Sequence, residues 1–283
     1  MKQSLTTCIL VLLFFFVGVA QENALLWKIS GNGLTRDSYL FGTLHMACSA
    51  DFSIPTKVEV ALKKTDYIAY EVDVTKPENR QIVQEKLKPN ANFFNGLAPY
   101  KKEAIDSALV AHGIPATIFD QISPAMVVSL ISMKSFDCPS MQDIKMMELE
   151  ISKMDAAKGK TVSELEDITF QLDLLDSLFS AEDLYAYFTS GLDMKEITRK
   201  MVNAYFSENL MDLQDLLLNT AYLSEEKQRQ LLTIRNQNWI AKMPNMMKEK
   251  PHFFAVGAGH LIGKSGLIQL LKNAGYTLTP VMN

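Results

Sequence analysis

Cysteine is scarce in this sequence. Only three of the 283 residues are cysteine, at positions 8, 48 and 138, and no two of them are spaced as C-x-x-C. The missing C-x-x-C spacing argues against a zinc ribbon and against a thioredoxin-like redox site. Cys8 lies in an apolar leader segment, so Cys48 and Cys138 remain in the rest of the chain. In an oxidising compartment these two form either one disulfide or two separate buried thiols, and both alternatives stay open here.

Runs of basic residues and the short motifs of several enzyme classes are also absent. The chain has 28 Lys and Arg against 32 Asp and Glu, a formal net charge of −4 at pH 7, and no basic run. It therefore lacks the electrostatic footprint of a nucleic-acid-binding protein, and we expect no nucleic-acid partner. There is no G-x-S-x-G motif for a serine nucleophile. The G-K-S-G at 263–266 lacks the upstream glycine of a Walker phosphate loop.

Long hydrophobic runs are absent after the first 20 residues. The opening segment carries one lysine, an apolar stretch from about Ile9 to Val19, and small residues at Gly18 and Ala20. This pattern predicts a signal peptide at 1–20 that is cleaved after Ala20, with an uncleaved anchor as the alternative. The apolar stretch is shorter than the roughly 20 residues of a membrane-spanning helix, so we expect no membrane span after cleavage. The mature chain, 21–283, is predicted to be one exported domain, periplasmic or extracellular, of undetermined oligomeric state.

The pattern of strands and helices predicts an α/β protein. Segments 25–31 and 37–45 are typical of two strands joined by a Gly-Asn-Gly turn, 54–66 of a helix, and 67–73 of a third strand. The end of the chain repeats this order, with a strand and turn at 252–260, a helix at 261–275 and a strand at 276–282. We therefore predict a mixed central sheet formed by the N- and C-terminal segments, with a large helical insertion at about 76–247 between them.

Within the insertion, prolines at 99, 115, 124 and 139 are expected to separate short helices. Residues 141–160 are expected to form one longer helix that ends at Gly159. The segment T-V-S-E-L-E is short and β-branched at its start, which favours a strand that delivers Glu166 to a turn.

Two strands end in the same motif, G-x-x-H. The first motif is Gly42 to His45 and the second is Gly257 to His260. Ligands of open α/β sheets gather at the carboxyl ends of strands, where we also place Glu71 and Glu166. Two imidazoles and one or two carboxylates on one rim predict a divalent metal site, since nitrogen and oxygen ligands suit zinc, manganese or cobalt. The alternative is that each histidine is an ordinary hydrogen-bonded structural residue.

Two further predicted site residues also have an alternative structural role. Strand alternation that hides Tyr70 and Val72 points Glu71 to the opposite side, where it is either functional or a plain exposed residue. Arg235 lies inside a predicted helix, where it belongs to an amphipathic surface or, if buried beside a metal, stabilises an oxyanion. The remaining histidines, His112 and His252, are predicted to be surface or structural residues.

Taken together, these motifs resemble one known family. L-L-W-K-I-S-G followed by S-Y-L-F-G-T-L-H, then G-K-T-V-S-E-L-E-D-I-T-F-Q, I-R-N-Q-N-W-I and F-F-A-V-G-A-G-H-L-I-G-K-S-G resemble the TraB/GumN family, which includes the Tiki proteases. The resemblance covers most of the mature chain. It implies a metal-dependent hydrolase with a fold related to erythromycin esterase and ChaN-like proteins, and a dependence on manganese or cobalt in Tiki members.

The family's site residues map onto matching positions of this chain. The G-x-x-H histidines are His45 and His260, and the acidic residue after the strand at 67–73 is Glu71. The Leu-Glu of the middle motif falls on 165–166, and the Arg-Asn pair on 235–236. The family often has glycine before that Leu-Glu, whereas this chain has Glu164 there, in the turn that leads to Glu166.

The resulting hypothesis is a divalent-metal-dependent hydrolase, most simply a peptidase acting on a peptide or protein substrate. His45, His260 and Glu71 are its predicted metal ligands, and Glu71 is alternatively the general base. Arg235 is predicted to hold the substrate's oxyanion or to stand behind a ligand, and Glu166 to orient a histidine. An esterase-like hydrolase and a non-catalytic protein that binds a metal or haem are the alternatives.

Overall fold

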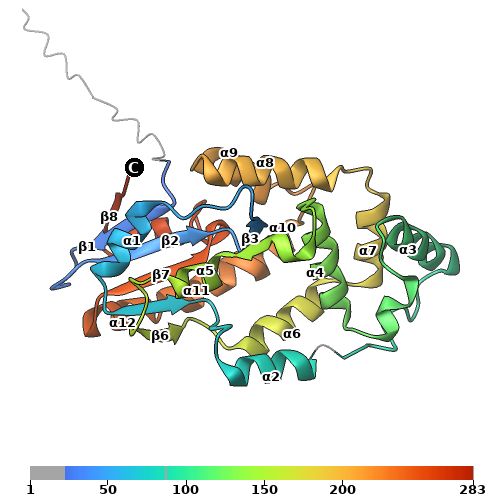
Figure 1. Cartoon of the computed structure of the whole chain (residues 1–283), viewed down its shortest axis with the longest axis horizontal. Helices are drawn as coiled ribbons and strands as arrows, with labels where there is room; N and C mark the ends of the chain where they lie inside the picture. The colour runs from blue at the N-terminus through green and yellow to red at the C-terminus, as the bar shows by residue number, and fades with distance from the viewer. Residues whose placement is uncertain (1–22, 87, 283) are drawn as a thin grey trace, which may run out of the picture.

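The computed structural model describes residues 23–86 and 88–282, so the predicted signal peptide lies outside the described residues. Its centre is a six-stranded mixed sheet in the order β6-β4-β7-β2-β1-β8 (Figure 1). The strands of this sheet are β1 (Leu26–Ser30), β2 (Ser38–Thr43), β4 (Tyr67–Tyr70), β6 (Thr161–Glu164), β7 (His252–Gly257) and β8 (Thr277–Pro280). The predicted fold class, a mixed sheet built from both ends of the chain with a helical insertion, is confirmed.

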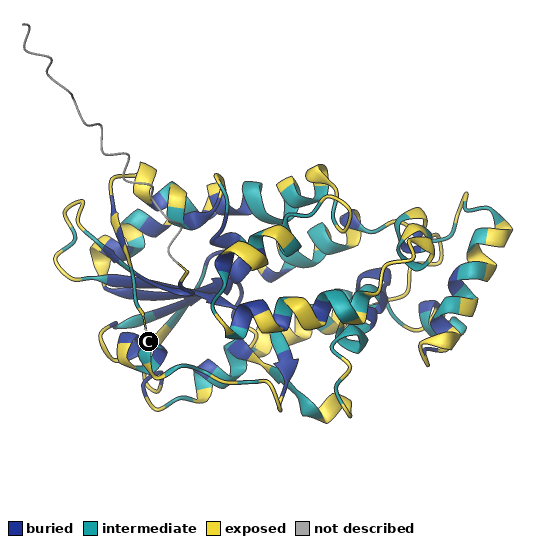
Figure 2. Cartoon of the chain, turned by 90° about the horizontal axis from the view of Figure 1, so that it is seen from above, coloured by how far each residue is buried: buried dark blue, intermediate teal, exposed yellow. Residues whose placement is uncertain are grey.

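Strands from the two ends of the chain are neighbours in the middle of the sheet. β2 pairs in parallel with β7, β7 with β4, and β4 with β6, whereas β1 is antiparallel to both β2 and β8. Every residue of β2 and β7 is buried. Figure 2 shows the strands of the sheet largely in dark blue, with helices on both sides. Strands covered on both faces have nearly continuous apolar sequences, which explains why Y-L-F and F-F-A-V show no alternation.

Helices make up most of the rest of the chain. They are α1 (Thr56–Lys63), α2 (Pro77–Lys86), α3 (Pro99–Ala111), η1 (Ala116–Asp120), α4 (Pro124–Ser135), η2 (Met141–Asp143), α5 (Met147–Lys153), α6 (Ile168–Leu178), α7 (Ala181–Thr189), α8 (Met194–Phe206), α9 (Leu210–Leu217), α10 (Glu225–Gln228), the π-helical η3 (Arg229–Thr233), α11 (Ile234–Ile240), α12 (Met243–Glu249), η4 (Ala258–His260) and α13 (Leu267–Asn273). Pro99 and Pro124 begin α3 and α4 as predicted, because proline suits the first turn of a helix. A second apolar cluster, separate from the one around the sheet, is formed by α3, η1, α4 and α7.

The prediction of one helix over 141–160 is wrong. This stretch contains η2, the short strand β5 (Ile144–Met146) and then α5. β5 pairs with β3 (Met46–Cys48), the strand that follows directly after His45. The sequence alone does not reveal β5, because so short a strand forms only where a partner strand pairs with it. That partner lies 98 positions earlier, as the Cα pair of residues 47 and 145 shows.

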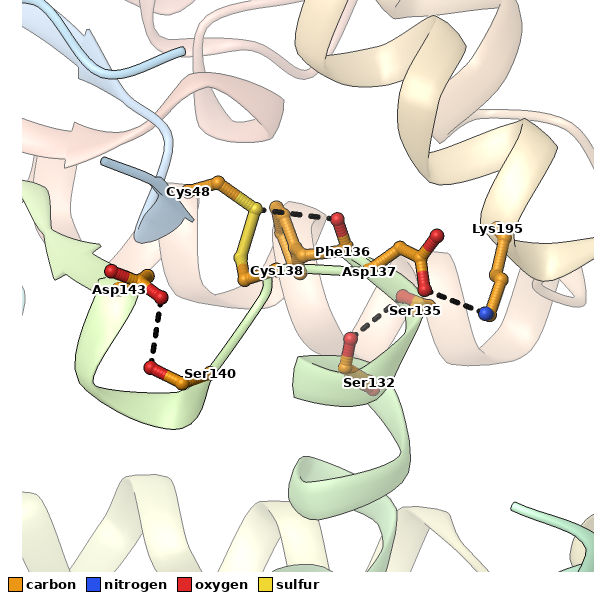
Figure 3. The surroundings of a disulfide bond; sticks show 9 residues. All are labelled: Cys48, Ser132, Ser135, Phe136, Asp137, Cys138, Ser140, Asp143 and Lys195. Atoms are coloured by element: carbon orange, nitrogen blue, oxygen red, sulfur yellow. Dashed lines mark hydrogen bonds and ion pairs between the residues drawn. A yellow bond between two sulfur atoms is a disulfide. The ribbon is translucent and has the colours of Figure 1, made fainter. Parts of the chain in front are cut away.

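Cys48 and Cys138 are joined in a disulfide with Cα atoms 5.4 Å apart and 90 positions between them in sequence (Figure 3). The structure therefore decides between the two alternatives that the sequence left open. The bond ties β3, beside His45, to the segment between α4 and η2. In the part of the chain that the structure describes, no helix is both long and apolar enough to cross a membrane.

Candidate active site

Four predicted site residues meet at one rim of the sheet because four neighbouring strands are parallel. His45 lies two residues after β2, Glu71 directly after β4, and Glu166 two residues after β6. His260 ends η4, the single turn that follows β7. The carboxyl ends of parallel strands lie at the same edge, so strand order alone brings together residues more than 200 positions apart.

His45 is held through its Nδ1 atom. Nδ1 lies 2.8 Å from Glu148 Oε1, which also accepts a hydrogen bond of 2.7 Å from the Thr43 hydroxyl. Because a carboxylate only accepts, Nδ1 carries the hydrogen and Nε2 faces the pocket. The His45 side chain is 56% exposed, the most open of the site residues. Its partial desolvation lowers the pKa, but the charge and hydrogen bond of Glu148 outweigh this and raise the pKa of His45 to about 9.

His260 is held in the same way, by an amide in place of a carboxylate. Its Nδ1 lies 2.6 Å from Asn236 Oδ1. The Asn236 amide nitrogen donates to two carbonyl oxygens, those of His260 and Ser265, so the amide orientation is determined and Nδ1 must carry the hydrogen. Burial of the ring lowers the pKa of His260 to about 3, so the ring is neutral at pH 7 and its Nε2 has a lone pair.

Glu71 lies between the two histidines. Its Oε1 is 3.7 Å from His260 Nε2 and 4.0 Å from His45 Nε2, and it accepts a hydrogen bond of 2.7 Å from the Gly257 N–H. Desolvation alone raises the pKa of the Glu71 carboxyl, but the facing histidines, Arg235 and the Gly257 N–H lower it to about 2. Glu71 is thus an ionised carboxylate at neutral pH and, with a side chain only 8% exposed, is not the plain exposed residue of the alternative reading.

Glycine is required at position 257 because the backbone approaches these groups closely. A Cβ atom built there would lie 3.0 Å from His45 Nε2 and 3.3 Å from Glu71 Oε1. A side chain at this position would therefore push against both groups.

Arg235 is buried and connects the carboxylates. Its Nε and Nη2 donate to Glu166, Nη2 also donates to Glu71 Oε2 at 2.5 Å, and Nη1 donates to the Leu231 carbonyl and to His260 Nε2. A guanidinium has five N–H groups, and these contacts occupy all of them. The prediction that Arg235 holds a substrate oxyanion therefore loses its geometric basis, and the contacts favour a positioning role.

Glu166 positions Arg235, not a histidine. Both Glu166 oxygens accept from the guanidinium, and Oε2 also accepts from the Trp239 indole N–H at 3.2 Å. Among the described residues no hydrogen bond joins Glu166 to His45 or His260, so its predicted role is corrected. The turn that holds it forms despite Glu164, whose side chain instead accepts from the Asp73 N–H and Asn79.

An open pocket of about 320 Å³ lies over this rim. His45, Glu71, Glu148, Gln171 and Arg235 contribute its polar groups. Gln171, from α6, donates to Glu71 Oε2 and to Glu166 Oε1. A pocket of this size, with a few converging polar groups, is typical of a small-molecule or peptide-bond site.

Glu148 and Gln171 belong to the site although no sequence motif marks them, and Asn236 was predicted only as part of the Arg-Asn pair, without a role. Glu148 lies in the stretch wrongly predicted as one helix. Its local sequence pattern does not distinguish it from Glu150, which forms a salt bridge with Lys153 instead of facing the site. The two other histidines match the prediction. His112 is exposed at the end of α3, and His252 is buried in β7 with Nδ1 against the Lys250 carbonyl.

His45, His260 and Glu71 have donor atoms suited to a divalent metal ion. Over residues 23–86 and 88–282, no group of three or more His, Cys, Asp or Glu side chains is already arranged to hold an ion. The chemistry of the donors nevertheless fits, because both histidines present Nε2 toward one oxygen of an ionised carboxylate while an oxygen atom holds each Nδ1. Nitrogen and oxygen atoms bound to one such ion lie roughly 3 to 3.5 Å from each other. The distances from Glu71 Oε1 to His260 Nε2 and His45 Nε2, 3.7 and 4.0 Å, would therefore have to shorten. Arg235 Nη1 donates a hydrogen bond of 3.1 Å to His260 Nε2, and this bond would have to break before the Nε2 lone pair could bind an ion.

The fold and rim define an α/β protein with a histidine–carboxylate centre at the carboxyl ends of parallel strands. A family model described as the TraB/PrgY/gumN family matches residues 25–280, and the chain belongs to this family. The resemblance drawn from the motifs is thereby confirmed.

Curated relatives carry metalloprotease names. The chain is 22% identical to Metalloprotease TIKI2 of Danio rerio, over 90% of this chain and 60% of that protein. It is 22% identical to Metalloprotease TIKI1 of Xenopus tropicalis, over 91% and 61%, and 19% identical to the Metalloprotease TIKI homolog of Nematostella vectensis, over 90% and 66%. The chain thus spans less than two thirds of these relatives' length. No solved structure matches the chain.

Proposed function

We propose that this chain is an exported peptidase that works with a divalent metal ion. One observation carries the proposal: His45 Nε2 and His260 Nε2 lie 4.0 and 3.7 Å from one Glu71 oxygen, with each Nδ1 held by an oxygen acceptor. Family membership and the metalloprotease names of the relatives support it. Export rests on the signal peptide predicted at 1–20.

His45, His260 and Glu71 are the residues that would hold the ion, whether manganese, cobalt or zinc. A bound ion of this kind lowers the pKa of a water molecule and polarises a carbonyl. Glu71 suits the part of a ligand better than that of a base, because a carboxyl with a pKa of about 2 takes up a proton poorly at neutral pH.

Glu148 is the carboxylate that can accept a proton from the attacking water. It lines the pocket, and among the described residues its one ion-pair partner is His45, whereas Arg235 holds both Glu71 and Glu166. Its contact with Thr43 fixes its direction. The same carboxylate therefore orients His45 and lies within the pocket where the substrate's peptide bond would sit.

The test uses the purified mature chain, stripped with a chelator and resupplied with manganese, cobalt or zinc. Cleavage of a mixed peptide library is followed by mass spectrometry in the wild type and in His45→Ala, His260→Ala and Glu71→Gln. His112→Ala is the matched control, since this histidine is exposed at the end of α3. We expect metal-dependent cleavage that only the three site variants lose.

Three results would count against the proposal. Metal binding without peptide cleavage, combined with hydrolysis of an ester panel, would make the protein an esterase. Tight metal or haem binding with no hydrolysis would make it a binding protein. Cleavage that survives the loss of both site histidines would show that the reaction occurs elsewhere.

A further inference from the structure

The pocket over the site has an apolar wall that the proposed chemistry does not use. Six of its eleven lining residues are aliphatic or methionine: Val72, Val74, Met146, Leu174, Leu175 and Leu231. They come from the loop after β4, from β5, from α6 and from η3, so segments far apart in sequence build one wall beside His45 and Glu71.

Part of this wall is open to solvent. Val74 and Met146 are 38% and 40% exposed, and both are among the large apolar side chains that the described part of the chain leaves exposed. An exposed apolar side chain beside a catalytic group is costly to hydrate, and a ligand that covers it removes that cost.

The apolar wall disfavours a charged occupant. The charged groups of the pocket lie beside this wall and already have partners: all N–H groups of Arg235 are engaged. His45 pairs with Glu148, and Glu71 faces the same space. The aliphatic side chains of the wall offer a charged group neither a hydrogen-bond partner nor an opposite charge, so an acidic or basic side chain placed against them would lose its hydration without compensation.

We infer that this wall is a specificity pocket for one apolar side chain, of leucine, methionine or phenylalanine size, next to the bond that is cut. The inference rests on the proposed peptidase function and adds its substrate class. The pocket of about 320 Å³ has room for such a side chain together with the peptide group beside it.

The first experiment measures cleavage of blocked peptides that differ at one position, with leucine, alanine, glutamate or lysine there. We expect kcat/KM for leucine to exceed that for alanine by roughly 10-fold, and the values for glutamate and lysine to be lower than both. Val74→Lys places a cation on the wall and is expected to improve glutamate relative to leucine. Val110→Lys, at a valine that is 61% exposed on α3, is the matched control and should leave the preference unchanged.

The second experiment measures binding without cleavage, so that failure of the pocket and failure of the peptidase proposal are distinguishable. The methyl groups of methionine are ¹³C-labelled in the metal-free mature chain, and the Met146 signal is assigned from Met146→Leu. A blocked leucine peptide should shift this signal, and a blocked glutamate peptide should not. Met211, 56% exposed on α9, is the internal control.

Each outcome counts against either the specificity pocket or the peptidase proposal. Cleavage without preference for an apolar residue overturns the pocket and leaves the peptidase proposal standing. Absence of cleavage with a leucine-dependent shift at Met146 overturns the peptidase proposal and keeps an apolar binding pocket. No shift at Met146 with any peptide, or an equal shift with both, overturns the pocket whatever the activity.

Discussion

Replacement of Arg235 by methionine tests whether the buried guanidinium stabilises the fold through its charge. Methionine keeps an unbranched side chain against Trp239 but leaves Glu71 and Glu166, both under 10% exposed, without their cation. The facing histidines, then Arg235 and the Gly257 N–H, lower the pKa of Glu71, so the guanidinium supplies only part of the stabilisation of this carboxylate. Removing one partner of a buried ion pair costs about 3 to 5 kcal/mol. We therefore expect the free energy of unfolding at pH 7 to fall by an amount in this range.

The pH dependence distinguishes charge from packing. Because the pKa of Glu71 is lower in the folded than in the unfolded protein, its stabilisation is present above about pH 4.5 and is lost as the pH falls toward 2. In the variant, Glu71 has lost the guanidinium that favoured its ionised form, so this carboxyl protonates at a higher pH than in the wild type. The difference between wild type and variant should thus shrink to less than half its neutral value at about pH 3.

Urea unfolding followed by circular dichroism at pH 7 and pH 3 gives the two differences. Arg229→Met is the matched control, since this arginine forms a similar pair with Glu226 at the surface and should change stability little. Adding Glu166→Gln to Arg235→Met should recover part of the loss at pH 7. A loss that is equal at both pH values would refute the electrostatic reasoning and assign the effect to packing on Trp239.

Three further predictions follow from the site and the disulfide. Metal binding at pH 7 should release about one proton, because the raised pKa of His45 keeps a proton on the ring that the ion must displace. Calorimetry in buffers of different ionisation enthalpy measures this release, which should be smaller for Glu148→Gln. An unchanged release would contradict the assigned role of Glu148. Gly257→Ala should weaken metal affinity at least roughly 10-fold because its Cβ meets both ligand side chains, whereas Gly259→Ala, whose Cβ meets only flexible leucine atoms, should bind normally in the same titration. Replacing both cysteines of the disulfide by serine should lower the free energy of unfolding by about 4 kcal/mol, since the bond closes a loop spanning 90 positions; an unchanged urea midpoint would show that the bond does not constrain the unfolded chain.

Local sequence patterns predicted most of the elements of the fold. The apolar runs in β2 and β7, the Gly-Asn-Gly turn after β1 and the prolines at the start of α3 and α4 each specify structure through nearby residues. They could therefore be predicted from the sequence alone. β5 could not, because a three-residue strand exists only where a partner strand supplies its hydrogen bonds.

The candidate site divides in the same way. The motifs identified the residues that end strands, His45, Glu71, Glu166 and His260, because parallel strands in one sheet must bring their carboxyl ends together. The partners of these residues depend on tertiary structure. Glu148 accepts a hydrogen bond from a histidine 103 positions away in sequence, and Arg235, predicted as a possible oxyanion donor, is the cation that joins two carboxylates. Strand order and motif spacing are properties of the chain, whereas hydrogen-bond partners and pKa values depend on which distant side chains are buried against each other, and only the folded structure decides that.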